Sequence, residues 1–275
     1  MTRERLYRTE AVVLKRSNFG EADRLLTLYT PHMGKRRVTA KGIRKLTSRK
    51  AGHLELFTHS QLLLARGRSL DIITQAETIN SFPKLRTDLS RTSHVYYISE
   101  LLDRFTREGI DNHPLFELLL QTLGWLDDGF NISLTARFYE LHLLGLVGYQ
   151  PQLFHCVRCN ETIKPTTNYF SAGDGGVVCP HCAQASPDPM QPTAVNSLKV
   201  LRYLQTHSIE DCYRLQLNAE IQKDLERIMQ RYITYYLERN LKSVEFIHLI
   251  RQPVKPFAYT PPAKTPPAKE ELQST

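Results

Sequence analysis

The chain has 275 residues and a formal net charge of +8; 41% of its residues are hydrophobic and 23% are charged, as in an ordinary globular protein with a core. No apolar run approaches the roughly 18 residues of a membrane span, and the N-terminal MTRERLYRTE lacks the apolar segment of a secretory signal. We therefore expect a cytosolic protein of two or three domains that makes no membrane contacts.

Residues 1–80 contain five segments of β type. Alternating apolar positions and β-branched residues predict strands near 6–16, 22–30, 34–41, 53–65 and 70–79. A long irregular link follows the third strand. Five short strands with such a link are typical of a small OB-fold barrel, an architecture that binds oligonucleotides.

The excess positive charge comes from one part of this region. No Asp or Glu occurs from Arg24 to His53, and removing the nine basic residues of that stretch from the total of 36 leaves 27, against 28 acidic residues. Because a basic surface attracts phosphates, we predict that these residues bind nucleic acid. They are Arg24, Lys35, Arg36, Arg37, Lys41, Arg44, Lys45, Arg49 and Lys50.

Two other interpretations of the basic stretch stay open. An ordinary solvated face would mix both signs of charge, and a membrane surface would favour an amphipathic basic helix, which Gly42 and Ile43 disfavour. Residues 35–50 contain no aromatic ring. The nearest rings that could stack on bases are Phe19, Tyr29 and Phe57, and we assign each of them to the core.

From Leu85 onward the apolar residues recur at helical spacing. The pattern predicts helices at 85–105, from Pro114 through Trp125, and at 132–147, where Gly148 suits the C-terminal cap. Later in the chain, Thr193 is expected to cap a helix that runs through Leu204, and a longer helix is expected at 218–241. We interpret all of these as a helical bundle. The tail at 252–275 has six prolines and is predicted to be disordered.

Two cysteine pairs, HCVRC and CPHC, interrupt the helical pattern. Cys156, Cys159, Cys179 and Cys182 follow the spacing of two knuckles that share one tetrahedral metal ion, and we predict a structural zinc. Iron in a rubredoxin-like site is the alternative, whereas a cytosolic location disfavours disulfides. The residues between the knuckles are expected to form a small hairpin, with His155 and His181 outside the ligand set. Cys212 is expected to be a small buried residue.

The predicted fold class is therefore α+β and multidomain. An N-terminal five-stranded OB-fold barrel precedes a helical bundle with an inserted four-cysteine zinc-binding module. The expected divisions are 1–80 for the barrel, 81–150 for the first helical part, 151–191 for the zinc module, 192–251 for the second helical part, and 252–275 for the tail.

No motif of a nucleotide hydrolase, a serine hydrolase or a zinc protease occurs, and no carboxylate pair is singled out, so we do not expect an enzyme. Two classes compete with a DNA-binding protein. One is an RNA-binding or translation accessory protein built from a barrel and a zinc ribbon. The other is a non-catalytic adaptor whose basic face is incidental.

Three stretches resemble the bacterial RecO family of DNA repair proteins. They are AVVLKRSNFGEADRLLTLYTPHMGK continuing into VTAKGIRK, FYELHLLGLVGYQPQLFHCVRCN, and the CPHC knuckle followed by more helix. The resemblance covers roughly residues 5–250 and leaves the tail outside. Asn160 departs from the pattern, since a Gly often follows the first knuckle in the family. Some relatives lack the cysteines, so zinc does not define the function.

The resemblance implies a recombination mediator that binds single- and double-stranded DNA and anneals complementary strands. It implies action with RecR, and often RecF, to load RecA onto DNA coated with single-strand-binding protein. The acidic C-terminal tail of that protein is expected to bind the helical part, with no residues assigned. The implied location is the bacterial cytoplasm, at the nucleoid. The nine basic residues match the family's basic stretch.

Overall fold

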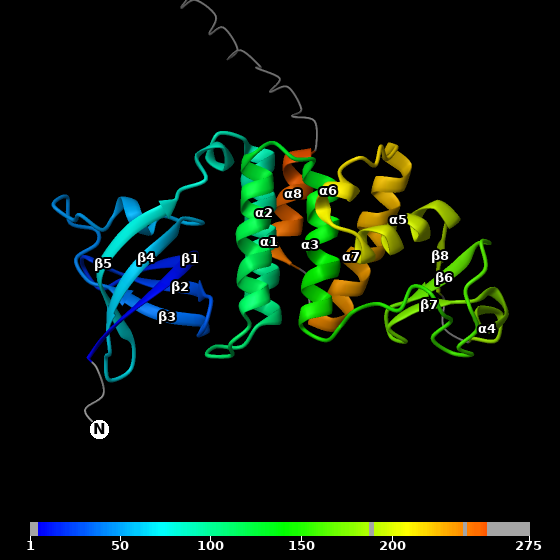
Figure 1. Ribbon diagram of the computed structural model, residues 1–275, viewed down its shortest axis with the longest axis horizontal. Helices are drawn as coiled ribbons and strands as arrows, with labels where there is room; N and C mark the ends of the chain where they lie inside the picture. Colours follow the sequence, from blue (N-terminus) through cyan, green and yellow to red (C-terminus); the bar gives the residue numbers. More distant parts are fainter. Residues whose placement is uncertain (1–4, 187–189, 239–240, 252–275) are drawn as a thin grey trace, which may run out of the picture.

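The computed structural model describes residues 5–186, 190–238 and 241–251, so the predicted tail at 252–275 lies outside the described residues. Within them, a barrel, a helical bundle and a small sheet follow one another along the long axis of the molecule (Figure 1). The barrel and the small sheet lie at opposite ends, with the helices between them (Figure 1).

The N-terminal strands close into a barrel in the order β1-β2-β3-β5-β4. Their bounds are β1 Leu6–Phe19, β2 Asp23–Thr30, β3 Gly34–Ala40, β4 His59–Ala65 and β5 Asp71–Asn80. All pairs are antiparallel except β3 with β5, where Val38 and Thr39 pair in parallel with Asp71 and Ile72. The link contains one 3-10 turn, η1 Gly52–Leu54. The predicted five-stranded OB-fold barrel is confirmed.

Strand β1 is buried on both faces at its centre, which explains why AVVL does not alternate. Ala11 and Val13 lie in the interior of the barrel. Val12 and Leu14 point the other way and join the core of the helical bundle, as do Tyr29 and Phe57. One side of the barrel is therefore a wall of the helical core.

The helices that follow form one bundle around that shared core. Their bounds are η2 Pro83–Arg86, α1 Leu89–Phe105, α2 His113–Asp127, α3 Ile132–Leu146, α5 Val195–Thr206, α6 Ile209–Cys212, α7 Ala219–Leu237 and α8 Lys242–Arg251. Asn side chains accept hydrogen bonds from backbone N–H groups at the start of α2, α3 and α7. Gly148 has a φ of +86°, as expected beyond the end of α3.

Two helix predictions are corrected. The N-cap of α5 is Ala194, not Thr193, because Thr193 pairs with Asn168 in a strand. The expected single helix at 218–241 ends at Leu237, and a separate helix, α8, begins at Lys242 and packs against α1. The chain thus returns to the helix that follows the barrel.

The cysteine region forms a small three-stranded sheet in the order β7-β6-β8. Its elements are β6 Asn168–Ser171, β7 Gly176–Val178, the short helix α4 Pro180–Gln184 and β8 Gln191–Thr193. The expected hairpin between the knuckles is β6 with β7. Because β8 belongs to this sheet, the sheet continues two residues past the division expected at residue 191.

The loop between α1 and α2 covers the edge of β3. Lys35 bridges to Glu108, and the Gly109 N–H donates to the Lys35 carbonyl at 2.9 Å. The Arg37 N–H donates to Glu108 Oε1 at 3.1 Å. Gly34 has a φ of +55°, and a Cβ added there would lie 1.8 Å from the carbonyl oxygen of Ile110. The barrel and the bundle are therefore in contact through backbone as well as side chains.

Replacing Gly34 by Ala is expected to destabilise the protein by about 2 kcal/mol, because the methyl group collides with a backbone carbonyl and the left-handed backbone is strained. Thermal unfolding measures the loss. Gly52→Ala is the matched control, since a Cβ at Gly52 meets no heavy atom within 4 Å. Equal melting temperatures for the two variants would contradict the tight contact.

Candidate nucleic-acid interface and metal centre

The structure divides the nine predicted nucleic-acid-binding residues by what their side chains contact. Arg24, Lys35 and Arg36 form ion pairs with carboxylates, at 3.5 Å to Glu55, 3.1 Å to Asp103 and 3.1 Å to Asp71. Part of the basic stretch is thus neutralised by carboxylates from outside it.

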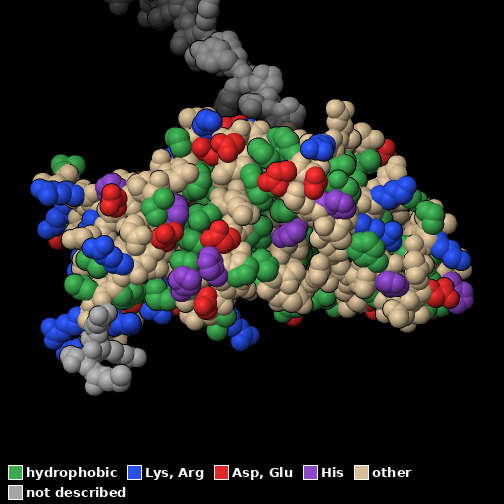
Figure 2. Space-filling view, in the orientation of Figure 1, with side chains coloured by type: hydrophobic (Ala, Val, Ile, Leu, Met, Phe, Trp, Pro, Cys, Tyr) green, Lys and Arg blue, Asp and Glu red, His purple; other side chains and the backbone are tan. Residues whose placement is uncertain are grey.

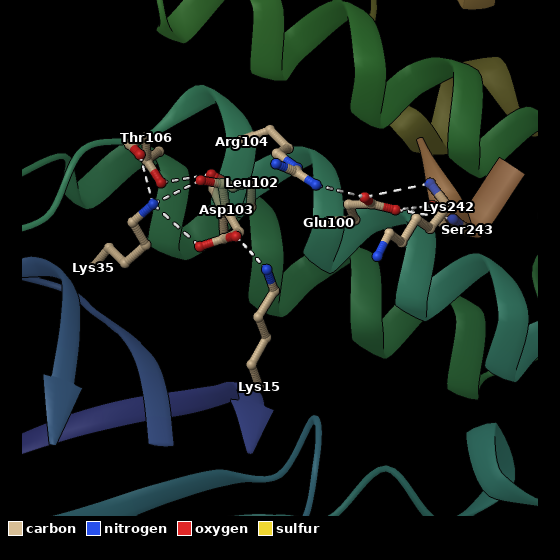
Figure 3. A network of polar contacts seen from close by, with 9 residues as sticks. All are labelled: Lys15, Lys35, Glu100, Leu102, Asp103, Arg104, Thr106, Lys242 and Ser243. Carbon is tan, nitrogen blue, oxygen red and sulfur yellow. Dashed lines mark hydrogen bonds and ion pairs between the residues drawn. The ribbon is translucent and has the colours of Figure 1, made fainter. Parts of the chain in front are cut away.

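Lys35 is committed to the contact between the barrel and the bundle. Its Nζ lies 2.6 Å from the carbonyl oxygen of Asp103, 2.7 Å from that of Thr106 and 3.1 Å from Asp103 Oδ1 (Figure 3). The Lys35 side chain is only 14% exposed. Since its three donors are used inside the protein, we leave Lys35 out of the proposed DNA surface.

Asp103 is the centre of this contact and accepts from two strands. Lys15 on β1 and Lys35 on β3 both donate to its carboxylate (Figure 3). Burial alone would raise the pKa of Asp103, but the two ammonium groups outweigh it and hold that pKa below the usual value. The sequence contains no signal for this pairing, because the partners are far apart in the chain.

Five of the predicted residues keep exposed side chains, and we call them the barrel patch. They are Arg37, Lys41, Arg44, Lys45 and Arg49. In the described part of the chain, none of their side chains forms an ion pair with a carboxylate, although the Arg37 backbone N–H donates to Glu108. All five lie on β3 or on the link that follows it. Figure 2 shows Lys and Arg side chains gathered at the barrel end of the molecule.

Lys50 is partly withdrawn from this surface. Its Nζ donates to the Ile73 carbonyl at 2.8 Å. Burial lowers the pKa of Lys50, and the negative charge of Asp23 offsets only part of that lowering. Lys50 therefore holds the link against β5 rather than extending freely into solvent.

The link is tied to the turn between β1 and β2. The Gly42 N–H donates to Asp23 Oδ1 at 2.7 Å, and the Arg44 N–H donates to the Ala22 carbonyl at 3.0 Å. Phe19, at the end of β1 beside this turn, is 53% exposed, which corrects its assignment to the core. Tyr29 and Phe57 are buried as expected. Phe19 is thus the ring of these three that can reach bases.

Further cations that the sequence reasoning missed lie on the turn between β4 and β5. Arg66 and Arg68 are exposed there, and the Arg66 guanidinium lies 4.9 Å from the centre of the Tyr7 ring. Tyr7 donates to Asp71 Oδ2 at 2.6 Å, and burial together with this bond raises the pKa of Tyr7 to about 12. Two arginines separated by one residue, between two predicted strands, were the sequence signal that could have identified this basic turn.

The four predicted metal ligands converge. The sulfur atoms of Cys156, Cys159, Cys179 and Cys182 all lie within 4.8 Å of one another, and those of Cys159 and Cys179 are 3.8 Å apart. A tetrahedral zinc with bonds of about 2.3 Å places its sulfur ligands about 3.8 Å apart. The group therefore has the size and the donor atoms to hold one metal ion.

Backbone N–H groups support these sulfur atoms. The Cys179 N–H donates to Cys156 Sγ at 3.3 Å, and the Cys182 N–H, at the start of α4, donates to Cys179 Sγ at 3.5 Å. Burial opposes ionisation of Cys156, but backbone donors from Cys159, Cys179 and Arg158 lower the pKa of its thiol to about 6. The contact with the Cys179 thiol, by contrast, raises the pKa of Cys182 to about 12, so the match to a metal ion rests on the four sulfur donors and their positions. Cys212, elsewhere in the bundle, is fully buried as expected.

Comparison with known proteins agrees with these features along nearly the whole chain. Residues 1–82 match the family model described as "Recombination protein O N terminal", and residues 86–245 match "Recombination protein O C terminal". A DNA repair protein RecO of Roseiflexus sp. (strain RS-1) is 45% identical over 250 residues, covering 91% of this chain and 88% of the relative. The chain belongs to the RecO family. The RecO of Dehalococcoides mccartyi is 39% identical over 244 residues, covering 89% of this chain and 96% of the relative.

The expected family and fold class are thus confirmed, and the protein is a RecO family DNA repair protein. The RecO of Pelotomaculum thermopropionicum is 37% identical over 243 residues, covering 88% of this chain and 94% of that relative. The two RecO family models meet at η2, where the barrel passes into the bundle. None of the helices in the described ranges is both long and apolar enough to cross a membrane.

Proposed function

We propose that this RecO family protein is a recombination mediator that binds single- and double-stranded DNA through the barrel patch and anneals complementary strands. The observation that carries the proposal is the set of five exposed cations on β3 and its link, whose side chains form no ion pair with a described carboxylate. Arg24 and Arg36 remain candidate contacts, because an ion pair that is partly exposed can exchange its carboxylate for a phosphate.

Annealing needs no chemical step, so we propose that the protein is not an enzyme. Two DNA strands repel each other, and a basic surface lowers that repulsion while leaving the bases free to pair. Contacts to the phosphate backbone carry no sequence information, so little sequence preference is expected. Phe19 can add stacking on an unpaired base.

The metal in this proposal is one structural zinc held by four cysteines. Four protein ligands leave no open position for a reacting water, and the ion would fix the fold of the two knuckles. The expected divisions of the chain are 1–80, 81–150, 151–191 and 192–251, with the tail after them, and we propose to move the one at 191 to 193, because β8 ends at Thr193.

The proposed partners follow from the family. The protein would act with RecR, and often with RecF, to load RecA, and it would bind the acidic tail of single-strand-binding protein. The proposed location is the nucleoid in the bacterial cytoplasm. An RNA-binding role is the competing proposal, since the barrel patch would contact either backbone. Titration with DNA and RNA of equal length separates the two.

Reversing Lys41, Lys45 and Arg49 to Glu tests the barrel patch. If the five cations neutralise about five phosphates, the slope of log affinity against log salt for a single strand is roughly −3.5. Removing three contacts is then expected to lower affinity about 100-fold at 0.1 M salt and to reduce the slope to about −1.4. Fluorescence anisotropy with an oligonucleotide at several salt concentrations measures both, alongside strand annealing with and without single-strand-binding protein.

The matched control reverses three exposed cations of the helical part, Lys84, Lys199 and Arg214, and so changes the net charge equally. It is expected to keep most of the affinity. Equal losses in the two triple variants would show that net charge, rather than the barrel patch, governs binding.

A further inference from the structure

A groove lies between helix α7 and the turn that joins β6 to β7, at the end of the molecule opposite the barrel (Figure 1). Its volume is about 710 Å³. The side chains that matter for its chemistry are Arg158, Arg227, Gln230, Arg231, Thr234 and Tyr235. The wall is therefore rich in guanidinium groups and hydrogen-bonding side chains.

Helix α7 contributes a stripe of cations that ends in a ring. Arg227, Arg231 and Tyr235 are spaced four residues apart and so lie above one another on one face of the helix. Tyr235 is 54% exposed. Arg231 is exposed and forms no ion pair with a described residue, whereas Arg227 is paired with Asp224.

The cysteine region, with the two knuckles and the strands β6 and β7, forms the other wall of the groove, and we call it the metal-binding module. Arg158 stands between the two cysteines of the first knuckle and donates from Nε and Nη2 to Asp174 Oδ2, at 3.0 and 2.9 Å. Both partners are about one-third exposed, so the pair faces solvent. The position of Arg158 depends on how the knuckle folds.

The glycines of the GDGG turn bring this wall close to the exposed ring. A Cβ at Gly173 would lie 3.1 Å from the Tyr235 hydroxyl, and one at Gly175 would lie 3.5 Å from that of Tyr236. The rings of Tyr235 and Tyr236 meet edge to face at 5.4 Å. The turn and the neighbouring ring thus hold Tyr235 in place while about half of it stays open to solvent.

We propose that this groove is a second binding site for single-stranded DNA, in which Tyr235 stacks on a base and Arg231, Arg227 and Arg158 contact the phosphates. An exposed ring beside a line of cations is the arrangement that binds single strands without sequence preference. A duplex keeps its bases stacked, so the ring selects unpaired strands. An acidic peptide fits less well, because it would need an apolar pocket for its side chains.

The inference rests on the proposed function and extends it. One chain with sites at both ends of its long axis can hold two DNA segments at once. The metal-binding module then contributes to DNA binding indirectly, by positioning Arg158 and the GDGG turn.

Photo-crosslinking of the full-length protein to an oligonucleotide that contains 5-iodouracil tests the proposal. We expect a crosslink within residues 227–238 in addition to crosslinks in the barrel. Tyr235→Leu is expected to abolish the α7 crosslink, and Arg231→Glu to weaken it about tenfold, while Arg214→Glu, an equal charge change on another surface, leaves it intact. Melting temperatures establish that the variants are folded.

The Lys41, Lys45 and Arg49 triple Glu variant separates this site from the barrel patch, and it is expected to keep the α7 crosslink. Crosslinks confined to the barrel would overturn the second site and leave the proposed function standing. An α7 crosslink with full affinity in the triple variant would overturn the barrel patch and leave the second site standing. Displacement of the α7 crosslink by an acidic peptide, but not by unlabelled single-stranded DNA, would also overturn the second site.

Discussion

Loss of the metal is expected to unfold the cysteine region while the barrel keeps its structure. In small zinc domains the ion contributes on the order of 10 kcal/mol of apparent binding free energy, which becomes folding free energy when the site forms only in the folded chain. Cys156→Ser removes one ligand at a position that is 1% exposed, and so leaves three thiolates without a tetrahedral set. Elemental analysis is expected to show loss of zinc, and calorimetry a separate, lower unfolding transition.

Cys212→Ala is the control for that experiment, because Cys212 is buried in the bundle and is no part of the four-sulfur group. It is expected to lose about 1 kcal/mol and to keep its full metal content. Full zinc content and an unchanged melting temperature in Cys156→Ser would contradict the four-cysteine assignment. A red wild-type protein that contains iron would show that the bound metal is iron rather than zinc.

Asp103→Ala is expected to lower the free energy of unfolding by about 2 kcal/mol, between the values for a surface and a buried ion pair, because Asp103 and Lys35 are partly exposed. The substitution leaves the largely covered Lys35 ammonium without its counter-charge and frees Lys15 from the bundle. Denaturant unfolding measures the loss. Asp128→Ala is the matched control, since Asp128 is exposed and forms no ion pair within the described ranges.

The same carboxylate predicts a dependence on pH. The pKa of Asp103 is lowered in the folded protein, so its contribution is fully present above the unfolded value of about 3.9 and is lost as pH falls through the folded value. The stability difference between the wild type and Asp103→Ala is therefore expected to be constant near pH 7 and to shrink below about pH 4. A difference that does not change with pH would contradict this role of Asp103.

Local patterns were sufficient for most of the fold. Alternation and turn residues predicted the five strands, and the spacing of Cys156, Cys159, Cys179 and Cys182 predicted a group of sulfur atoms that the structure brings together. Thr193 was assigned wrongly because its pairing with Asn168 in the small sheet outweighs its preference for a helix cap.

The basic stretch shows where sequence reasoning ends. Charge counting treats Lys35 and Lys41 alike, yet the first is held by Asp103 and the second is exposed. The difference depends on the partner across the barrel wall, 68 positions later in the chain. Phe19 was missed for a similar reason, since exposure at a strand end depends on which turns surround it.

The shared wall between the barrel and the bundle has a consequence for cooperativity. A chain cut near residue 82, where the two family matches meet, would expose Val12, Leu14 and Tyr29 to water and leave the edge of β3 open for pairing with other chains. Residues 1–82 are matched by their own family model, yet they share a core with the bundle, so we expect the barrel and the bundle to unfold in a single transition.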